Sequence, residues 1–295
     1  MNIQLLMLRS LPLLLLLVSS FSWAKQYSAT AMVLKVDSAK KTMTASCQAI
    51  PGFMSAMTMP FKVKDRKELA GLAPGEVVEF TLVVTRTTSY AEHVRVKPYQ
   101  SSEQDPFTAE RLALLKQISR GPDSKTTQLS VGERVPDFTL IDTERRSVKL
   151  SQFSGKVVAL NFIYTSCALP NFCYRTANNF SVLQKRFSKR LGTDLVLLTV
   201  TFDPERDQPE VLAHYARTWK ADPATWHFLT GPAADVHHVT DMFGMDFFPD
   251  EGLMNHSLHT AVIDRRGKLV ANIEGNRYSP EQLGDLVQTV LGSKR

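Results

Sequence analysis

The chain has 295 residues, of which 43% are hydrophobic and 22% charged, and its formal net charge is +6. This length allows two domains, and this composition excludes a largely disordered or fibrous chain. Basic residues are not interleaved with aromatic ones as they are in a nucleic-acid groove, so we expect no nucleic-acid partner.

Residues 1–24 have the pattern of a secretory signal peptide. Arg9 precedes the apolar run 11–18, and small residues lead up to Ala24. The run is too short to cross about 30 Å of hydrocarbon comfortably. We therefore predict export to the periplasm, cleavage after Ala24 and a soluble mature protein that meets a membrane surface only through a client. An uncleaved inner-membrane anchor is the alternative.

Residues 25–97 form the first predicted domain. Apolar or β-branched segments separated by turn residues predict five short strands, at 33–36, 42–47, 57–63, 77–85 and 92–96. Five strands in so short a segment predict a small all-β barrel of the OB type.

Residues 98–130 are predicted to be a connector with one short helix. The segment is mostly polar, Asp105 and Pro106 mark a helix start, and Gly121 marks its end. If it were flexible, a connector of about 33 residues would span on the order of 30 Å, so that sites in the two domains could meet.

Residues 131–295 alternate between strand and helix patterns. The predicted strands are 157–164, 195–202, 260–264 and 269–274, and the predicted helices include 209–219, 233–243 and 280–291. A further helix follows the first strand, with the apolar residues Phe180, Leu183, Phe187 and Leu191 on one face. This order predicts an α/β domain with a mixed sheet.

Three cysteines are present: Cys47, Cys167 and Cys173. In an oxidising compartment two of them can pair and one is left over. Cys167 and Cys173 enclose a short loop between a strand and a helix. Cys173 lies at the helix N-terminus, where unsatisfied N–H groups favour a thiolate. A thiolate serves both disulfide exchange and soft-metal binding, and a plain stabilising disulfide is the alternative.

Three separated motifs in residues 131–292 resemble the SCO/SenC family. They are the run 162–173 around the two cysteines, the run 201–207 (Thr-Phe-Asp-Pro-Glu-Arg-Asp), and Asn255-His256-Ser257 followed by 262–264. The resemblance implies a thioredoxin-like fold in which Cys167, Cys173 and His256 bind copper. Family members help to build the dinuclear copper centre of cytochrome c oxidase, as copper donors, thiol reductants or both.

The chain departs from the usual family pattern in its cysteine loop. Many members have three residues between the cysteines and a proline after each, whereas this chain has five, with Ala168 and Tyr174 in the proline positions. All three ligating groups are retained, so the departures bear on redox potential and partner fit. Asp203 and Asp207 are expected to order the loop.

Three further histidines are expected to lie outside the metal site. His259 is expected at the surface, facing away from His256. His237 and His238 are adjacent in a predicted helix, do not share a face, and are expected to be solvated.

A second soft-metal site is predicted on the strand that carries Met57 and Met59. The two thioethers share one sheet face, and together with a thiolate they select Cu(I). On spacing alone, the favoured interpretation is an alternating core face formed by Met57, Met59, Phe61 and Val63. Residues 29–97 also resemble the CusF-like copper-binding modules of the periplasm, in which a histidine and two methionines hold Cu(I) under an aromatic cap. Met57 and Met59 match the methionines, Cys47 takes the histidine position, and Met54 falls near the cap.

The sequence thus favours a periplasmic protein that binds copper and delivers it to a copper-receiving partner, a cytochrome c oxidase subunit by the family resemblance. Two alternatives remain. Cys167 and Cys173 could form the redox pair of a thiol–disulfide oxidoreductase that reduces the cysteines of such a partner. The chain could also sequester copper as a tolerance factor with no client. Sequence alone leaves open whether the protein is an enzyme.

Overall fold

The computed structural model describes residues 24–97, 114, 128–250 and 253–293. The predicted signal peptide and nearly all of the predicted connector helix lie outside these residues; Leu114 is the one connector-helix position described, and it is helical. None of the described helices is long and apolar enough to cross a membrane.

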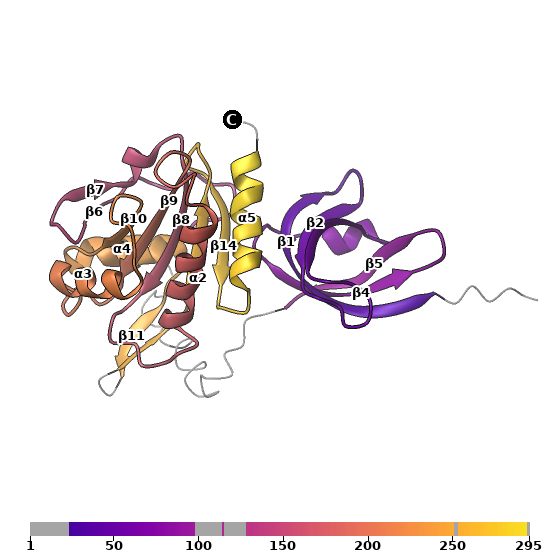
Figure 1. Ribbon diagram of the computed structural model, residues 1–295, viewed down its shortest axis with the longest axis horizontal. Helices are drawn as coiled ribbons and strands as arrows, with labels where there is room; N and C mark the ends of the chain where they lie inside the picture. Colours follow the sequence, from indigo (N-terminus) through magenta and orange to yellow (C-terminus); the bar gives the residue numbers. More distant parts are fainter. Residues whose placement is uncertain (1–23, 98–113, 115–127, 251–252, 294–295) are drawn as a thin grey trace, which may run out of the picture.

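The N-terminal part is a five-stranded antiparallel sheet (Figure 1) with strand order β3-β2-β1-β4-β5. Its strands are β1 (Lys25–Asp37), β2 (Thr42–Cys47), β3 (Met57–Lys62), β4 (Val77–Val84) and β5 (Ser89–Val96). The five predicted strands are therefore confirmed. The two outer strands meet where Val63, just after β3, forms a bridge with Ala91 of β5. Closure into a full barrel stays a prediction.

The C-terminal part is a mixed α/β sheet with order β10-β9-β8-β13-β14. Its strands are β8 (Val157–Ile163), β9 (Leu195–Thr201), β10 (Trp226–Leu229), β13 (His259–Ile263) and β14 (Leu269–Glu274). β8, β9 and β10 are parallel, and β13 is antiparallel to both β8 and β14. Every residue of β8 and β9 is buried, as expected for central strands covered on both faces.

Four described helices complete this part: α2 (Cys173–Arg186), α3 (Pro209–Thr218), α4 (Ala233–Phe243) and α5 (Pro280–Gly292). α2 and α5 pack against each other and against β8. α5 also contacts β1 and β2, so it lies between the two parts of the molecule (Figure 1). α3, α4 and α5 agree with the sequence prediction to within one residue, whereas α2 ends at Arg186, so Phe187 and Leu191, which were expected on its apolar face, lie beyond its end.

Several short elements were not predicted. β10 is one of them, and the others are two hairpins: β6 (Thr139–Ile141) with β7 (Ser147–Lys149), and β11 (Phe247–Asp250) with β12 (Leu253–His256). Each strand has only three or four residues, too few to establish a periodic pattern. The β11–β12 hairpin matters for the site because its last residue is His256.

Candidate metal centre

The cysteine loop connects the buried end of β8 to the start of α2. Cys167 lies in the turn after β8 and is half-buried, whereas Cys173 is the first residue of α2 and is buried. The turn is held by backbone bonds from the Cys167 N–H to the Tyr164 carbonyl and from the Phe172 N–H to the Leu169 carbonyl. Because both ends of the loop are anchored, its two sulfur atoms are held close together.

His256 reaches this loop from the β11–β12 hairpin and is only 2% exposed. Its ring packs against those of Tyr164, Phe172 and Phe202, at centroid distances of 5.6, 5.5 and 4.8 Å. His256 Nδ1 lies 2.7 Å from the carbonyl oxygen of Ser257. A carbonyl oxygen only accepts hydrogen bonds, so Nδ1 carries a proton, and Nε2 is the ring nitrogen that can bind a metal once it holds no proton of its own.

The structure brings together the three residues that the sequence singled out. Ligand atoms of Cys167, Cys173 and His256 all lie within 4.8 Å of one another. None of the three cysteines of the chain is in a disulfide. Two sulfurs and an imidazole nitrogen at this spacing fit a soft or borderline metal ion, with the thiolates favouring Cu(I) and the imidazole also accepting Cu(II).

The two cysteines of the loop differ in charge. Hydrogen bonds from the Cys173 side chain, from His256 and from the backbone outweigh burial and lower the pKa of Cys167 to about 4. Burial, reinforced by the neighbouring Cys167 sulfur, raises the pKa of Cys173 well above its usual value. The prediction of a thiolate at Cys173 was therefore wrong: the N–H at the start of α2 stabilises the charge on Cys167, which keeps access to solvent.

Asp207 orders the first half of the loop, as the sequence predicted. Its fully buried carboxylate accepts hydrogen bonds from the backbone N–H and the hydroxyl of Thr165, and from the hydroxyl of Thr201 at 2.6 Å. Asp203 begins the turn, and its carbonyl oxygen accepts from the N–H groups of Arg206 and Asp207. Neither carboxylate belongs to the sulfur–imidazole cluster.

The other histidines do not join the cluster. His259 was expected at the surface, but it is only 5% exposed and its Nδ1 lies 3.1 Å from Oδ1 of Asn272. It is buried because β13 is covered on both faces. His237 and His238 are exposed as predicted, and the His237 ring stacks on Phe247 at 4.9 Å.

The three aromatic rings that surround His256 were not predicted from the sequence. They belong to Tyr164, Phe172 and Phe202, which all fall inside the motifs that flank the cysteines and the Asp203–Asp207 turn. An aromatic residue at each end of the loop was the available signal, but only the fold shows that all three rings meet one imidazole.

The sulfur residues of the N-terminal sheet also come together. Cys47 of β2 pairs directly with Met57 of β3, and Ala45 pairs with Met59, so the three sulfur side chains share one face of adjacent strands. Cys47 is buried, Met59 is partly buried and Met57 is 49% exposed. Burial raises the pKa of Cys47 to about 11, so a metal that binds there must displace a proton.

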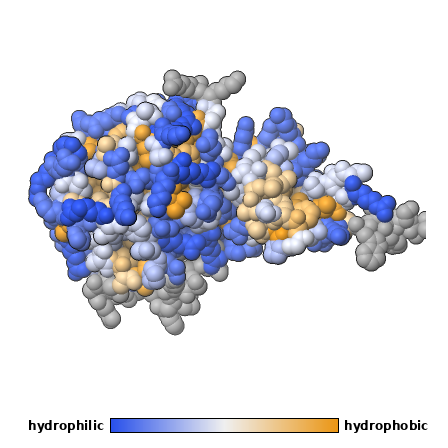
Figure 2. Space-filling view, in the orientation of Figure 1, coloured by the Kyte–Doolittle hydropathy of each residue, from blue (hydrophilic) through white to orange (hydrophobic). Residues whose placement is uncertain are grey.

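The loop between β2 and β3 folds back on itself and packs against the core of this sheet. Ile50 and Met54 form a bridge, and Met54 packs, partly buried, against the same core cluster as Cys47 and Met59. The neighbouring Phe53 is 41% exposed and stacks on Tyr27 at 4.3 Å. Figure 2 shows hydrophobic side chains gathered on the visible face of this smaller lobe.

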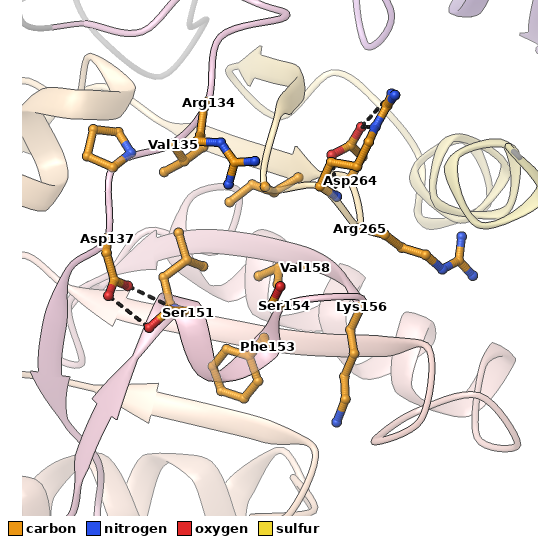
Figure 3. Close-up of a pocket in the computed structure, with 15 residues that line it drawn as sticks. Arg134, Val135, Asp137, Ser151, Phe153, Ser154, Lys156, Val158, Asp264 and Arg265 are labelled. Atoms are coloured by element: carbon orange, nitrogen blue, oxygen red, sulfur yellow. Dashed lines mark hydrogen bonds and ion pairs between the residues drawn. The ribbon is translucent and has the colours of Figure 1, made fainter. Parts of the chain in front are cut away.

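A cavity of about 250 Å³ lies at the other end of β8, between Arg134, Ser151, Val158 and Asp264 (Figure 3). Several of its polar groups bond to one another: Asp137 accepts from Ser151, and Arg266 pairs with Asp264 at 3.2 Å. Since Cys167 follows the opposite end of the strand, this cavity is separate from the metal centre.

Comparison with known proteins gives two family matches and several relatives. Residues 126–292 match the family described as SCO1/SenC, and residues 26–95 match the one described as copper binding periplasmic protein CusF. The SCO2-like protein of Rickettsia typhi is 27% identical over 151 residues, which cover 48% of this chain and 69% of that protein. The SCO1 protein homolog of Bacillus subtilis is 30% identical over 97 residues, covering 33% of this chain and 49% of that protein. The crystal structure of Arabidopsis thaliana ScoI with copper bound aligns with 55% of this chain and 98% of its own, at 22% identity and a TM-score of 0.47.

Proposed function

The chain belongs to the SCO1/SenC family, and on that premise we propose that it is a periplasmic copper chaperone that carries copper on Cys167, Cys173 and His256. The observation that carries the proposal is the placement of two sulfurs and one imidazole within 4.8 Å of one another. Thiolate and imidazole together suit both oxidation states of copper. The client is a copper-receiving protein, and cytochrome c oxidase is its proposed destination.

The residues around the site support exchange rather than permanent storage. Cys167 is accessible and already a thiolate, so it can make the first bond to an incoming metal ion or the last bond to a departing one. Cys173 and His256 are buried, which keeps water and competing ligands from the inner positions. When bound, copper supplies a Lewis acid that holds both sulfurs deprotonated.

We further propose that Cys47, Met57 and Met59 form a second Cu(I) site, with Met54 near the position of an aromatic cap. Thioether and thiol sulfurs on one sheet face select Cu(I) over harder ions. The exposed Met57 supports this proposal, because a methionine that served only as core packing would be expected to be buried.

A thiol–disulfide oxidoreductase is the second candidate, and the unequal charges of the two cysteines favour it. An accessible thiolate beside a buried thiol is the arrangement that attacks a partner's disulfide. His256 distinguishes the two functions, because dithiol exchange does not require a buried imidazole beside both sulfurs. A third candidate function is that the protein sequesters copper and so confers copper tolerance, without delivering the metal to a client.

The test is copper stoichiometry of the reduced full-length protein against a competing Cu(I) chelator. We expect two copper ions per chain, of which one is lost when Cys167 and Cys173 are replaced by serine. Transfer to a metal-free copper-receiving domain then separates delivery from storage. A cysteine-loop variant that still binds two ions would refute the main site.

A further inference from the structure

The two parts of the molecule are packed tightly against each other. Met32 and Leu34 of β1 are buried in the same core cluster as Ala271 and Ile273 of β14, whereas Val33, between them, faces the core of the N-terminal sheet. At Gly75, a Cβ atom would lie 2.9 Å from side-chain atoms of both β14 residues. The backbone of the turn before β4 therefore abuts β14 at Gly75, leaving no room for a side chain at that position.

Asp285 of α5 provides the polar centre of this contact. Its Oδ2 accepts hydrogen bonds from the hydroxyl of Ser46 at 2.7 Å and from the hydroxyl of Thr58 at 2.8 Å. Its Oδ1 pairs with Arg186 of α2 at 2.6 Å. One turn earlier on α5, Gln282 Nε2 donates to the carbonyl oxygen of Ser46. A single carboxylate thus links β2 and β3 to two helices of the C-terminal part.

These contacts fix the direction in which the sulfur residues point. Ser46 precedes Cys47, and Thr58 lies between Met57 and Met59. Successive side chains of a strand point to opposite faces, so the strand face that meets Asp285 is the one opposite the sulfurs. Cys47 and Met59 pack inside the N-terminal core, as this alternation requires. The second candidate site is turned away from the C-terminal part.

The cysteine loop lies at a distance from this contact. Cys173 begins α2 and Arg186, the partner of Asp285, ends it, and a helix of that length measures about 20 Å. α5 lies between α2 and the N-terminal sheet (Figure 1). Metal–sulfur bonds are about 2.3 Å long in zinc–thiolate sites, so direct hand-over requires the two ligand sets to approach within a few ångströms.

We propose that Asp285 is a latch that holds the N-terminal sheet in a docked state in which its sulfur site and the cysteine loop cannot exchange copper. Hand-over within one molecule takes place only after Ser46 and Thr58 leave the carboxylate. The expectation that the two sites meet freely across a flexible connector does not hold for the docked state. This proposal rests on the second copper site proposed above; the docking itself does not.

The test compares full-length wild type with Asp285→Ala and with the double variant Ser46→Ala, Thr58→Val, which opens the latch from the other side. Glu281→Ala is the matched control, because Glu281 is an exposed carboxylate on the same helix. Small-angle X-ray scattering and hydrogen exchange of β2 report docking. Loss of two hydrogen bonds to a charged acceptor should raise the undocked population at least about tenfold in both latch variants, with no change in the control.

Copper movement is followed separately by NMR of ¹³C-methyl methionine. The starting protein carries Cu(I) on the N-terminal site and a disulfide between Cys167 and Cys173. A phosphine then reduces the disulfide to two thiols and becomes a phosphine oxide, with one water molecule supplying the oxygen and the two thiol protons, while copper stays Cu(I). The first-order loss of copper from Met57 and Met59 should be about tenfold faster in the latch variants than in wild type. Equal rates, or latch variants that stay docked, would overturn the latch. If the methyl signals of Met57 and Met59 show no bound copper at the start, the second copper site is refuted instead.

Discussion

Thr165 and Asp207 lie 42 residues apart in the sequence and are joined by two hydrogen bonds. The backbone N–H of Thr165 donates to one carboxylate oxygen at 3.0 Å, and its hydroxyl donates to the other. Thr201, at the end of β9, donates to the same carboxylate. The segment that leads into Cys167 is therefore tied to the neighbouring strand by one buried side chain.

Replacement of Asp207 by alanine should loosen this segment. The change leaves buried donors unsatisfied, and we expect the free energy of unfolding to fall by about 3 kcal/mol. Copper affinity should fall as well, since Cys167 is no longer held in place. Chemical denaturation and chelator competition measure the two effects. Asp207→Asn, which keeps one accepting oxygen, should lose less stability and less copper affinity than the alanine variant. An alanine variant as stable as wild type would contradict this role of Asp207.

His256 should be required for copper affinity but not for thiol chemistry. Because the ring is packed among three aromatic residues, His256→Gln, which nearly preserves its volume, is preferable to alanine. We expect at least about tenfold weaker copper binding at the cysteine loop from the loss of one ligand. Reduction of a model disulfide should continue at a similar rate, because the hydrogen bond from the Cys173 side chain, which is the largest cause of the lowered pKa of Cys167, is retained. His238→Ala, an exposed histidine, is the control. Unchanged copper affinity in His256→Gln would remove the imidazole from the ligand set.

Much of the fold could be predicted because it follows from periodic patterns. The all-buried strands β8 and β9 are apolar apart from Asn161 in β8 and Thr199 and Thr201 in β9, and α4 was predicted at its observed boundaries. The environment of Cys173 could not be predicted in this way. Its place at a helix start was recognised, but its burial depends on how β8 and α2 pack, and burial reversed the expected charge. Likewise, Ser46 has the pattern of a surface residue and is buried only because α5 covers it.

The metal-free, reduced protein should have one cysteine that reacts at low pH. With its pKa lowered to about 4 from 9.0, Cys167 stays a thiolate between pH 6 and 8, so its alkylation rate should barely change over that range. An ordinary thiol would lose about 100-fold of its rate on going from pH 8 to pH 6. Iodoacetamide labelling followed by mass spectrometry of each cysteine measures this. Labelling of Cys173 before Cys167 would contradict the assignment.

The lowered pKa of Cys167 also determines in which direction the stability of the folded protein changes with pH. A group whose pKa is lower in the folded state contributes stability that is fully present above its unfolded pKa and is lost as the pH falls. For Cys167 this contribution should therefore decline from about pH 9 down to pH 4. Comparison of denaturation of the metal-free wild type with Cys167→Ser over this range isolates the effect. A difference between the two proteins that grows as the pH falls would contradict the sign.

Oxidation should abolish copper binding at the cysteine loop without touching Cys47. A disulfide between Cys167 and Cys173 removes both thiolates, whereas Cys47 is buried in a different core cluster. Counting thiols in denaturant before and after mild oxidation should show that two of the three are lost. Copper stoichiometry should fall by one and return on reduction. Oxidation that consumes no thiols and leaves copper binding unchanged would refute the shared use of these sulfurs.

The methionines of β3 should hold the second copper ion. Met57→Leu with Met59→Leu keeps the apolar volume and removes both thioethers, so the full-length variant should bind one copper ion fewer while its thermal unfolding stays close to that of wild type.

The matched control is Met43→Leu, because Met43 lies in β2 of the same sheet and is fully buried in its core. That change also replaces a thioether, but at a position that pairs with Phe61 and lies two residues before Ala45, the partner of Met59. The cysteine loop should bind copper normally in both variants. Stoichiometry and affinity are measured with a competing Cu(I) chelator. Binding that is indifferent to the Met57 and Met59 changes would show that these residues are ordinary core and edge positions of the sheet.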